Sequence, residues 1–192
     1  MRRRALLILG AAAAGGSLAV AWRLGKPVIH RPVGAPPEVR LLGIAALQRT
    51  DPAVPLPPAT LVDGTGAPHG LAEFAGTGLV INLWATWCVP CVAELPALAV
   101  LAGRLKESPV RVLALASDRG GAPVVEAFYR RHGIVGLPVW LDPKGAAGQA
   151  WGVRGIPTTL VVDAEGRERG RLEGAADWAS DAAVAEIKGL VG

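Results

Sequence analysis

The chain has 192 residues, 51% of them hydrophobic, which is enough for one domain of ordinary size and an extension. Its formal charge is +4, but residues 1–31 hold six Lys or Arg and no acid. The remaining 161 residues carry 14 basic and 16 acidic side chains and are net −2. Because the positive charge is confined to the N-terminal segment, the composition argues against a basic face for nucleic acid.

The N-terminal segment has the order of an export signal. Three arginines at positions 2–4 precede eighteen uncharged residues, 5–22, and Arg23 follows. This pattern predicts a signal or anchor over residues 1–22, with the N-terminus in the cytoplasm and the rest of the chain exported. Ala19-Val20-Ala21 fits a cleavage site, so a soluble mature form starting near residue 22 is the alternative to an anchored one. Residues 3–7 also resemble a twin-arginine signal.

A proline-rich segment follows the predicted anchor. Residues 23–58 hold eight prolines, which favours an extended tether over residues 23–57. Within it, residues 39–47 are apolar enough for a short helix. We expect the globular domain to span residues 58–192, starting with a strand at 59–62 and a turn at 63–66.

The only two cysteines, Cys88 and Cys91, follow an apolar strand predicted at residues 79–84 and open a predicted helix. At a helix N-terminus the first sulfur is stabilised as the reactive thiolate, and the second lies one turn deeper. We therefore expect an exposed, attacking Cys88 and a buried, resolving Cys91. A structural disulfide across so short a loop would stabilise little.

A zinc site is not expected, because no further cysteine exists and the three histidines lack ligand spacing. These are His30, His69 and His132. His132 lies at the predicted end of a helix, where a cation favours the helix dipole, so we do not interpret it as a catalytic base.

The helix that starts at the cysteines is predicted to reach residue 105, with one apolar face made by Cys91, Leu95, Leu98, Ala102 and Leu105. Pro90 fits its first turn, whereas Pro96 lies deeper and predicts a kink. The later elements alternate in type. We predict strands at 110–116, 138–141, 158–162 and 167–172, the last an edge strand, and helices at 123–132, 145–151 and 180–188. This order predicts an α/β fold with a mixed sheet flanked by helices on both faces.

These motifs resemble the thioredoxin superfamily. The residues that carry the resemblance are Trp87-Cys88-Val89-Pro90-Cys91 and, 67 residues after Cys88, Gly155-Ile156-Pro157-Thr158. Together with residues 82–86, Glu94 and residues 174–180, they resemble its TlpA branch, the membrane-anchored thiol:disulfide reductases of the bacterial periplasm. The resemblance covers about residues 55–190.

The resemblance implies a role for each matching position. Cys88 matches the nucleophile and Cys91 the resolving thiol, and no cofactor or metal is implied. Pro157 matches a proline in cis linkage that faces the dithiol. The surface that receives partner peptides would then comprise Trp87, Val89, Pro90, Ile156 and Pro157.

Asn82 stands where cytoplasmic thioredoxins carry a buried aspartate, and an amide cannot exchange a proton in that way. Glu94, close to the apolar stripe of its helix and three residues after Cys91, is then the candidate acid/base. A buried carboxyl of raised pKa could take up and return the proton of Cys91. The alternative is a surface glutamate at the edge of the helix.

The resemblance also implies partners. These are cysteine-containing envelope proteins: factors that assemble the copper centre of cytochrome oxidase or, in sister branches, apocytochrome c. Thr158 replaces the glutamate of the cytochrome c maturation variant Gly-x-Pro-Glu, which favours the first. A membrane electron donor would re-reduce the pair. The motif Val89-Pro90 contains no cation to stabilise a thiolate, so we expect a reducing potential.

Two other functions fit the sequence less well. A thiol peroxidase of the peroxiredoxin type needs a threonine three residues before its cysteine, and Thr86 is only two residues before Cys88. A copper-binding chaperone would need one more residue between the cysteines and a partner histidine.

Overall fold

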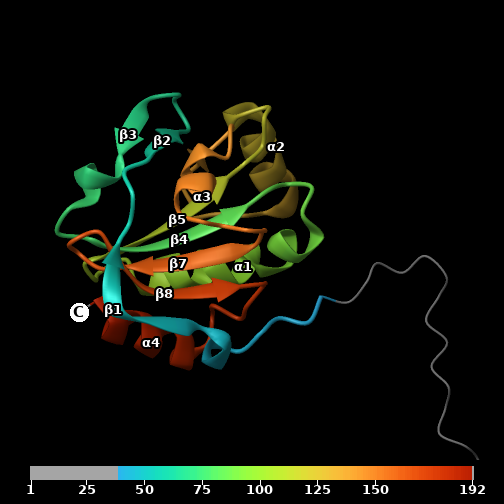
Figure 1. Ribbon diagram of the computed structural model, residues 1–192. Coiled ribbons are helices and arrows are strands. Elements are labelled where there is room, and N and C mark those ends of the chain that lie inside the picture. The colour runs from blue at the N-terminus through green and yellow to red at the C-terminus, as the bar shows by residue number, and fades with distance from the viewer. Residues whose placement is uncertain (1–38, 192) are drawn as a thin grey trace, which may run out of the picture. The chain divides into compact units, whose positions relative to one another are not determined.

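The computed structural model describes residues 39–191, which fold around one mixed sheet in the order β1-β8-β7-β4-β5-β6-β2-β3 (Figure 1). The strands are β1 (Gln48–Pro55), β2 (Thr60–Asp63), β3 (Pro68–Gly70), β4 (Gly78–Trp84), β5 (Val110–Ala116), β6 (Trp140–Leu141), β7 (Thr158–Val162) and β8 (Arg167–Glu173). The helices are α1 (Val89–Arg104), α2 (Ala122–His132), α3 (Ala146–Ala150) and α4 (Asp181–Val191), with short 3-10 turns η1 (Ile44–Ala46) and η2 (Leu71–Phe74).

Strand β4 lies at the centre of the sheet, parallel to β5 and antiparallel to β7. All seven of its residues are buried, as expected for a continuous apolar run with helices on both sides. Because successive side chains point to opposite faces, β4 divides the core into two layers. Val80 and Trp84 pack in the layer that contains residues of α1, α2 and α4, and Leu79, Ile81 and Leu83 pack in the layer that contains residues of η2 and α3.

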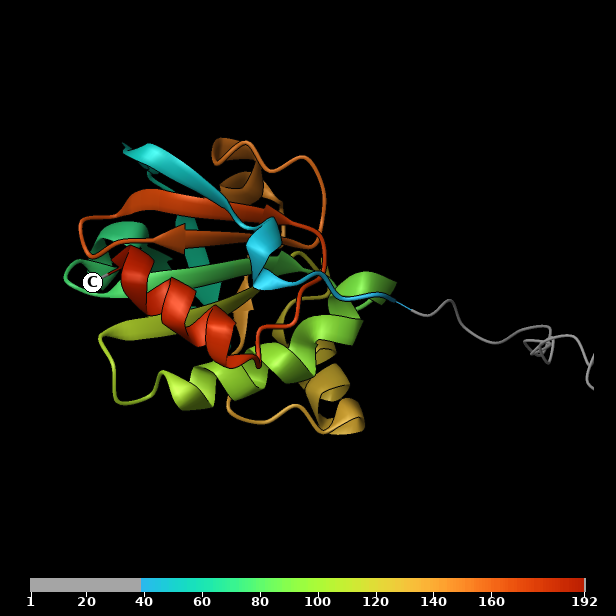
Figure 2. The same ribbon diagram turned by 90° about the horizontal axis from the view of Figure 1, so that it is seen from below.

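Figure 2 shows α1, α2 and α4 on one side of the sheet and α3 on the other, which confirms the predicted fold class. Helix α1 is held by fully buried leucines at positions 95, 98 and 101. Burying one leucine side chain contributes roughly 1.5–3 kcal/mol, so this stripe fixes the helix firmly against β4 and β5. The first turn of α1 is thereby placed at the end of β4.

One prediction about the domain's beginning is wrong. Residues 48–55, expected within the tether, form strand β1, which pairs antiparallel with β8. The prolines misled the prediction: Pro52 and Pro55 are tolerated because β1 is an edge strand whose register shifts between Arg49 and Val54. Strand β8 is therefore not the edge of the sheet, and the domain starts before residue 58.

Other boundaries differ by a few residues. Helix α4 continues through Gly189 to Val191 instead of ending at residue 188. Ser180 does act as its cap, since its Oγ accepts a hydrogen bond from the backbone N–H of Ala183 at 3.2 Å. Gly133 ends α2 with φ of 64°, a left-handed conformation that glycine adopts readily.

No helix within residues 39–191 has the length and apolar character needed to cross a membrane. The signal or anchor predicted at residues 1–22 lies outside the described residues, as does the tether up to residue 38.

Candidate active site

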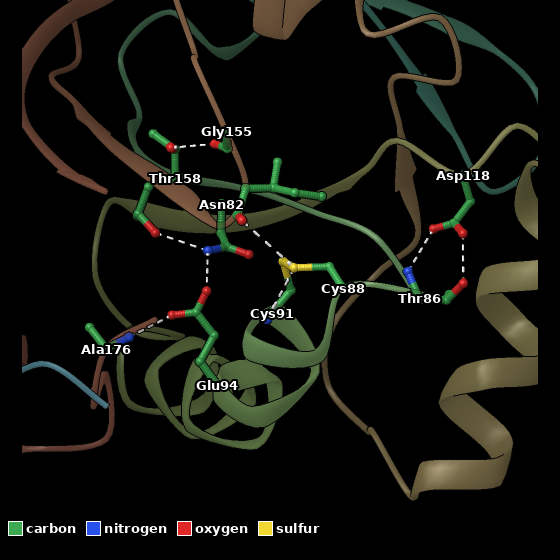
Figure 3. The surroundings of a disulfide bond; sticks show 11 residues. Asn82, Thr86, Cys88, Cys91, Glu94, Asp118, Gly155, Thr158 and Ala176 are labelled. Atoms are coloured by element: carbon green, nitrogen blue, oxygen red, sulfur yellow. Dashed lines mark hydrogen bonds between the residues drawn. A yellow bond between two sulfur atoms is a disulfide. The ribbon is translucent and has the colours of Figure 1, made fainter. Parts of the chain in front are cut away.

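The two cysteines lie where β4 passes into α1 (Figure 3). Cys88 is the N-cap of α1, and its Sγ accepts a hydrogen bond from the backbone N–H of Cys91 at 3.3 Å. The two sulfurs form a disulfide with an S–S distance of 2.06 Å. The helix start therefore directs N–H groups at the first sulfur, as the sequence predicts, and this environment favours a thiolate once the bond is reduced.

Cys88 and Cys91 differ less in solvent exposure than expected. Cys88 is 6% exposed and Cys91 is fully buried, so the order is as predicted but Cys88 is itself a buried residue in the disulfide form. Its neighbours are open to solvent: Trp87 is 70% exposed, Val89 is 53% exposed and Pro90 is also exposed. The disulfide thus sits at the edge of an exposed apolar rim.

The peptide bond between Ile156 and Pro157 is cis, which confirms that prediction. Ile156 presents its carbonyl oxygen 3.8 Å from Cys88 Sγ, and its side chain is half-buried, whereas Pro157 is buried. Thr158 fixes this loop by donating its hydroxyl to the carbonyl of Gly155 at 2.7 Å. A cavity of about 480 Å³ has Trp87 and Ile156 in its lining, together with residues of α3 and of the loop between α3 and Ile156.

Glu94 is fully buried one turn beyond Cys91, so the surface alternative is wrong. Its Oε1 accepts a hydrogen bond from Asn82 Nδ2 at 2.9 Å. Its Oε2 accepts bonds from the backbone N–H of Ala176 at 2.8 Å and from Trp178 Nε1 at 2.7 Å. Figure 3 shows the carboxyl group of Glu94 between Asn82 and Ala176.

Burial raises the pKa of Glu94 above that of an ordinary glutamate, and the hydrogen bonds from Ala176, Trp178 and Asn82 act in the opposite direction. Within residues 39–191 no positively charged group bonds to the carboxyl, so desolvation prevails. The site therefore contains a buried carboxyl group of raised pKa one helical turn beyond the resolving cysteine.

Asp118 is a site residue that the sequence reasoning missed. It is buried directly after β5, and its carboxylate accepts bonds from the backbone N–H of Thr86 at 3.0 Å and from the Thr86 hydroxyl at 2.6 Å. This clamp fixes the loop that carries Trp87 and Cys88. The available signal was an acidic residue just beyond the carboxyl end of a buried parallel strand.

The histidines lie elsewhere. His132 occupies the last turn of α2, as predicted, with its ring stacked on Phe128 at 4.1 Å between centroids. His69 lies on β3 between two carboxylates, Asp63 and Glu73. Within residues 39–191, no three His, Cys, Asp or Glu side chains converge in a group that could hold a metal ion. His30 lies outside the described residues.

The family model Redoxin matches residues 51–186. The chain belongs to the Redoxin family. It is 32% identical over 120 residues to a protein named thiol-disulfide oxidoreductase ResA from Geobacillus thermodenitrificans. The matched residues make up 62% of this chain and 67% of that relative. A second ResA, from Bacillus thuringiensis, is 30% identical over 118 residues, with the same coverage.

Solved structures agree with this assignment. The exposed lipoprotein thioredoxin Etrx1 of Streptococcus pneumoniae superposes with a TM-score of 0.60 at 26% identity, covering 70% of this chain and all of that one. A thiol:disulfide interchange protein of Chlorobium tepidum, at 24% identity, shares the fold with a TM-score of 0.59 over 74% of this chain and 99% of its own. This Redoxin family member is a TlpA-like protein of the thioredoxin superfamily and a thiol-disulfide oxidoreductase.

Proposed function

We propose that the chain is a reductase of cysteine pairs in proteins of the bacterial envelope, working by dithiol-disulfide exchange. The observation that carries the proposal is the Cys88–Cys91 pair at the start of α1, with the buried carboxyl of Glu94 one turn further. The motif between the cysteines supplies no cation to stabilise a thiolate beyond the helix start, which favours a reducing potential.

The exchange proceeds in two steps. The Cys88 thiolate attacks one sulfur of a partner disulfide, whose S–S bond breaks and releases one partner thiolate, leaving a mixed disulfide. The Cys91 thiolate then attacks Cys88 Sγ and releases the second partner thiolate. The partner gains two electrons and the chain is left with the disulfide seen in the structure. Glu94 accepts the proton of Cys91 before the second step and gives it to the departing partner thiolate, so that Glu94 is ionised again when the disulfide has formed.

The partner docks on the apolar rim around Cys88. The rim consists of Trp87, Val89, Pro90, Ile156 and Pro157. Three of these residues, Trp87, Val89 and Pro90, are exposed, and apolar side chains beside a reactive sulfur suit an extended partner segment because their burial contributes binding energy at the point of exchange. The Ile156 carbonyl, 3.8 Å from Cys88 Sγ, is free to accept a hydrogen bond from the backbone of such a segment.

We place the chain on the periplasmic side of the inner membrane, held by residues 5–22. The sequence pattern of that segment supports this location. A reporter fused after Gly192 is expected to be active only outside the cytoplasm, and the protein is expected to remain with membranes after a high-salt wash. Recovery of a soluble form starting near Trp22 would show that the segment is cleaved and does not anchor the protein, and it would still support export.

We further propose that the partners are factors that assemble the copper centre of cytochrome oxidase, with apocytochrome c as the second candidate. Thr158 after the cis proline supports the first. The oxidising compartment also requires a membrane electron donor that returns two electrons to the Cys88–Cys91 disulfide. The Cys91→Ser variant, which cannot resolve the mixed disulfide, should trap the partner from envelope extracts for identification by mass spectrometry.

Reduction of insulin disulfides with an excess of a small dithiol tests the activity. The chain should accelerate the reaction, Cys88→Ser should abolish the acceleration, and the surface variant Glu126→Gln should leave it unchanged. A chain that consumes peroxide at the expense of the dithiol, or that binds copper in an absorbance titration without reducing insulin, would overturn the proposal. A pair half reduced near −120 mV, the potential of the strong oxidants, would overturn the direction.

A further inference from the structure

The side-chain amide of Asn82 bonds to Glu94, and only one of its two ends has partners. Its Nδ2 donates to Glu94 Oε1 at 2.9 Å and to Thr159 Oγ1 at 2.9 Å. Its Oδ1 is buried and has no hydrogen-bond partner among the described residues. Figure 3 shows this oxygen on the side of the amide that faces the two sulfurs. An unpaired buried acceptor is costly, and such groups are rare in folded proteins.

The chemistry of Glu94 explains this orientation of the amide. An ionised carboxylate has no hydrogen to donate, so the N–H end of Asn82 must face it and the oxygen must face away. In the disulfide the sulfur of Cys91 has no hydrogen either, and Oδ1 is left alone. Reduction gives Cys91 an S–H group, which is a donor for that oxygen.

We propose that Asn82 couples the protonation states of Glu94 and Cys91 by turning its amide. With Glu94 ionised and Cys91 a thiol, Nδ2 faces the carboxylate and Oδ1 accepts the S–H. With Glu94 protonated and Cys91 a thiolate, the amide turned by 180° accepts the carboxyl O–H at Oδ1 and donates Nδ2–H to the sulfur. One proton is present on the pair in both arrangements. The inference rests on the proposed function of the site and assigns Asn82 as a positioning residue.

Thr159 makes both arrangements acceptable. Its hydroxyl is fully buried, and it can accept from Nδ2 in one orientation and donate to Oδ1 in the other. When both groups are ionised, one of them faces Oδ1 and receives no hydrogen bond from the amide. When both are protonated, the Glu94 proton is on Oε1, because Oε2 already accepts two N–H bonds, and one end of the amide then faces a second donor. Asn82 therefore favours a single proton shared by Glu94 and Cys91.

Few charged groups lie near Glu94 and Cys91 among the described residues. The atoms that bond to Glu94 come from β4 and from the segment before α4, and all are uncharged amide or indole groups. Among the buried carboxylates, Asp118 is bonded to Thr86. Asp177, between the two residues that donate to Glu94, is exposed and accepts from the backbone of Ala179. In the part of the chain that the structure describes, Cys88 is the other titratable group at the site.

A double-mutant cycle tests the coupling. In the full chain carrying Cys88→Ser, Cys91 is the only thiol, and its ionisation can be followed by thiolate absorbance across pH. Glu94→Gln should change the thiolate fraction at a fixed pH by roughly tenfold, about one pKa unit, when Asn82 is present. With Asn82→Leu the same change should fall to less than about threefold.

An equal shift with and without Asn82, or no shift at all with Asn82 present, would overturn the proposal. Asn82→Ala, which adds no volume, replaces Asn82→Leu if circular dichroism shows that the latter is unfolded. As a readout that leaves Asn82 in place, the side-chain amide signals of Asn82 in the nitrogen-15 NMR spectrum should titrate with the midpoint of Cys91. Signals that do not move with it would also overturn the proposal. Neither measurement depends on turnover, whereas the insulin assay tests the proposed function alone.

Discussion

The pKa of a glutamate is raised in one carboxylate cluster of this molecule and lowered in another. Glu94 is fully buried, its partners are neutral N–H groups, and its pKa is raised. Glu73, 57% exposed in its side chain, accepts from the His69 ring at 2.9 Å and from the backbone N–H of Gly70, and its pKa is lowered. Asp63, on the other side of His69, also has a lowered pKa, chiefly through its bond from the Thr65 hydroxyl and then through His69.

The comparison shows that the number of hydrogen bonds does not decide the sign of the shift. Glu94 accepts three and still has a raised pKa, because loss of solvent costs the charged form more than neutral donors return. Around His69, solvent and a ring that becomes positively charged both favour ionised carboxylates. The first arrangement suits proton exchange with a thiol, and the second suits a fixed ion pair.

The largest expected effect is on stability when the buried carboxyl is removed. Glu94→Leu leaves the N–H groups of Ala176 and Trp178 without acceptors in the interior and removes one of the two acceptors of Asn82 Nδ2. We expect the free energy of unfolding to fall by about 3 kcal/mol, since each orphaned group costs roughly 1–3 kcal/mol. Glu73→Leu, the matched change in the exposed cluster, should cost much less. Chemical denaturation of the two variants measures the difference, and equal losses would contradict the comparison.

The sequence predicts the central strands and the redox pair of this site but not the partners of Glu94. Continuous apolar runs predict β4, β5 and β7 because both faces of each strand are covered, and the Cys88–Cys91 spacing predicts the redox pair. The partners of Glu94 on Ala176 and Trp178 are 82 and 84 residues away along the chain, and one of them is a backbone N–H that no residue type marks. Only the folded sheet brings them together. Strand β1 was missed because its prolines are acceptable only at a sheet edge, which depends on its pairing with β8.

A smaller effect is expected from one donor to the buried carboxyl. Trp178→Phe removes the Nε1–H that donates to Glu94 Oε2 at 2.7 Å. Because that bond favours the ionised form, its loss should raise the pKa of Glu94 further and lower the unfolding free energy by about 1.5–3 kcal/mol. Trp151→Phe is the matched control, since the Trp151 ring is also buried and donates to the carbonyl of Pro57 at 2.9 Å. It should leave the pKa of Glu94, followed by carbon-13 NMR of its carboxyl, unchanged.

The next effect in size is a difference between Glu94 and Glu73 in how stability depends on pH. A group with a raised pKa in the folded state binds its proton more tightly there than in the unfolded chain. Its contribution is therefore complete at pH below the ordinary glutamate pKa and is lost as pH rises through the folded pKa. Glu94→Gln should remove this decline, seen as a flatter plot of unfolding free energy against pH. For Glu73 the sign is reversed: its contribution is present above the ordinary pKa and is lost as pH falls through the lowered one.

The smallest expected effect concerns His69, which lies between Glu73 and Asp63 with bonds of 2.9 and 3.1 Å from its two ring nitrogens. The bonds to Glu73 and then Asp63 raise its pKa, so its contribution to stability is complete below the ordinary histidine pKa and is lost as pH rises through the folded value. His69→Gln should lower the melting temperature slightly at mildly acidic pH, because solvent screens this half-buried group, and hardly at all at alkaline pH, where the ring is neutral. Added salt should reduce the acidic difference, as expected for an ion pair that solvent reaches, and leave the Glu94→Leu loss in place. A His69→Gln effect that is independent of both pH and salt would show that the ring acts by packing, for instance against Trp140 at 5.2 Å, and would remove the ion pair from the comparison.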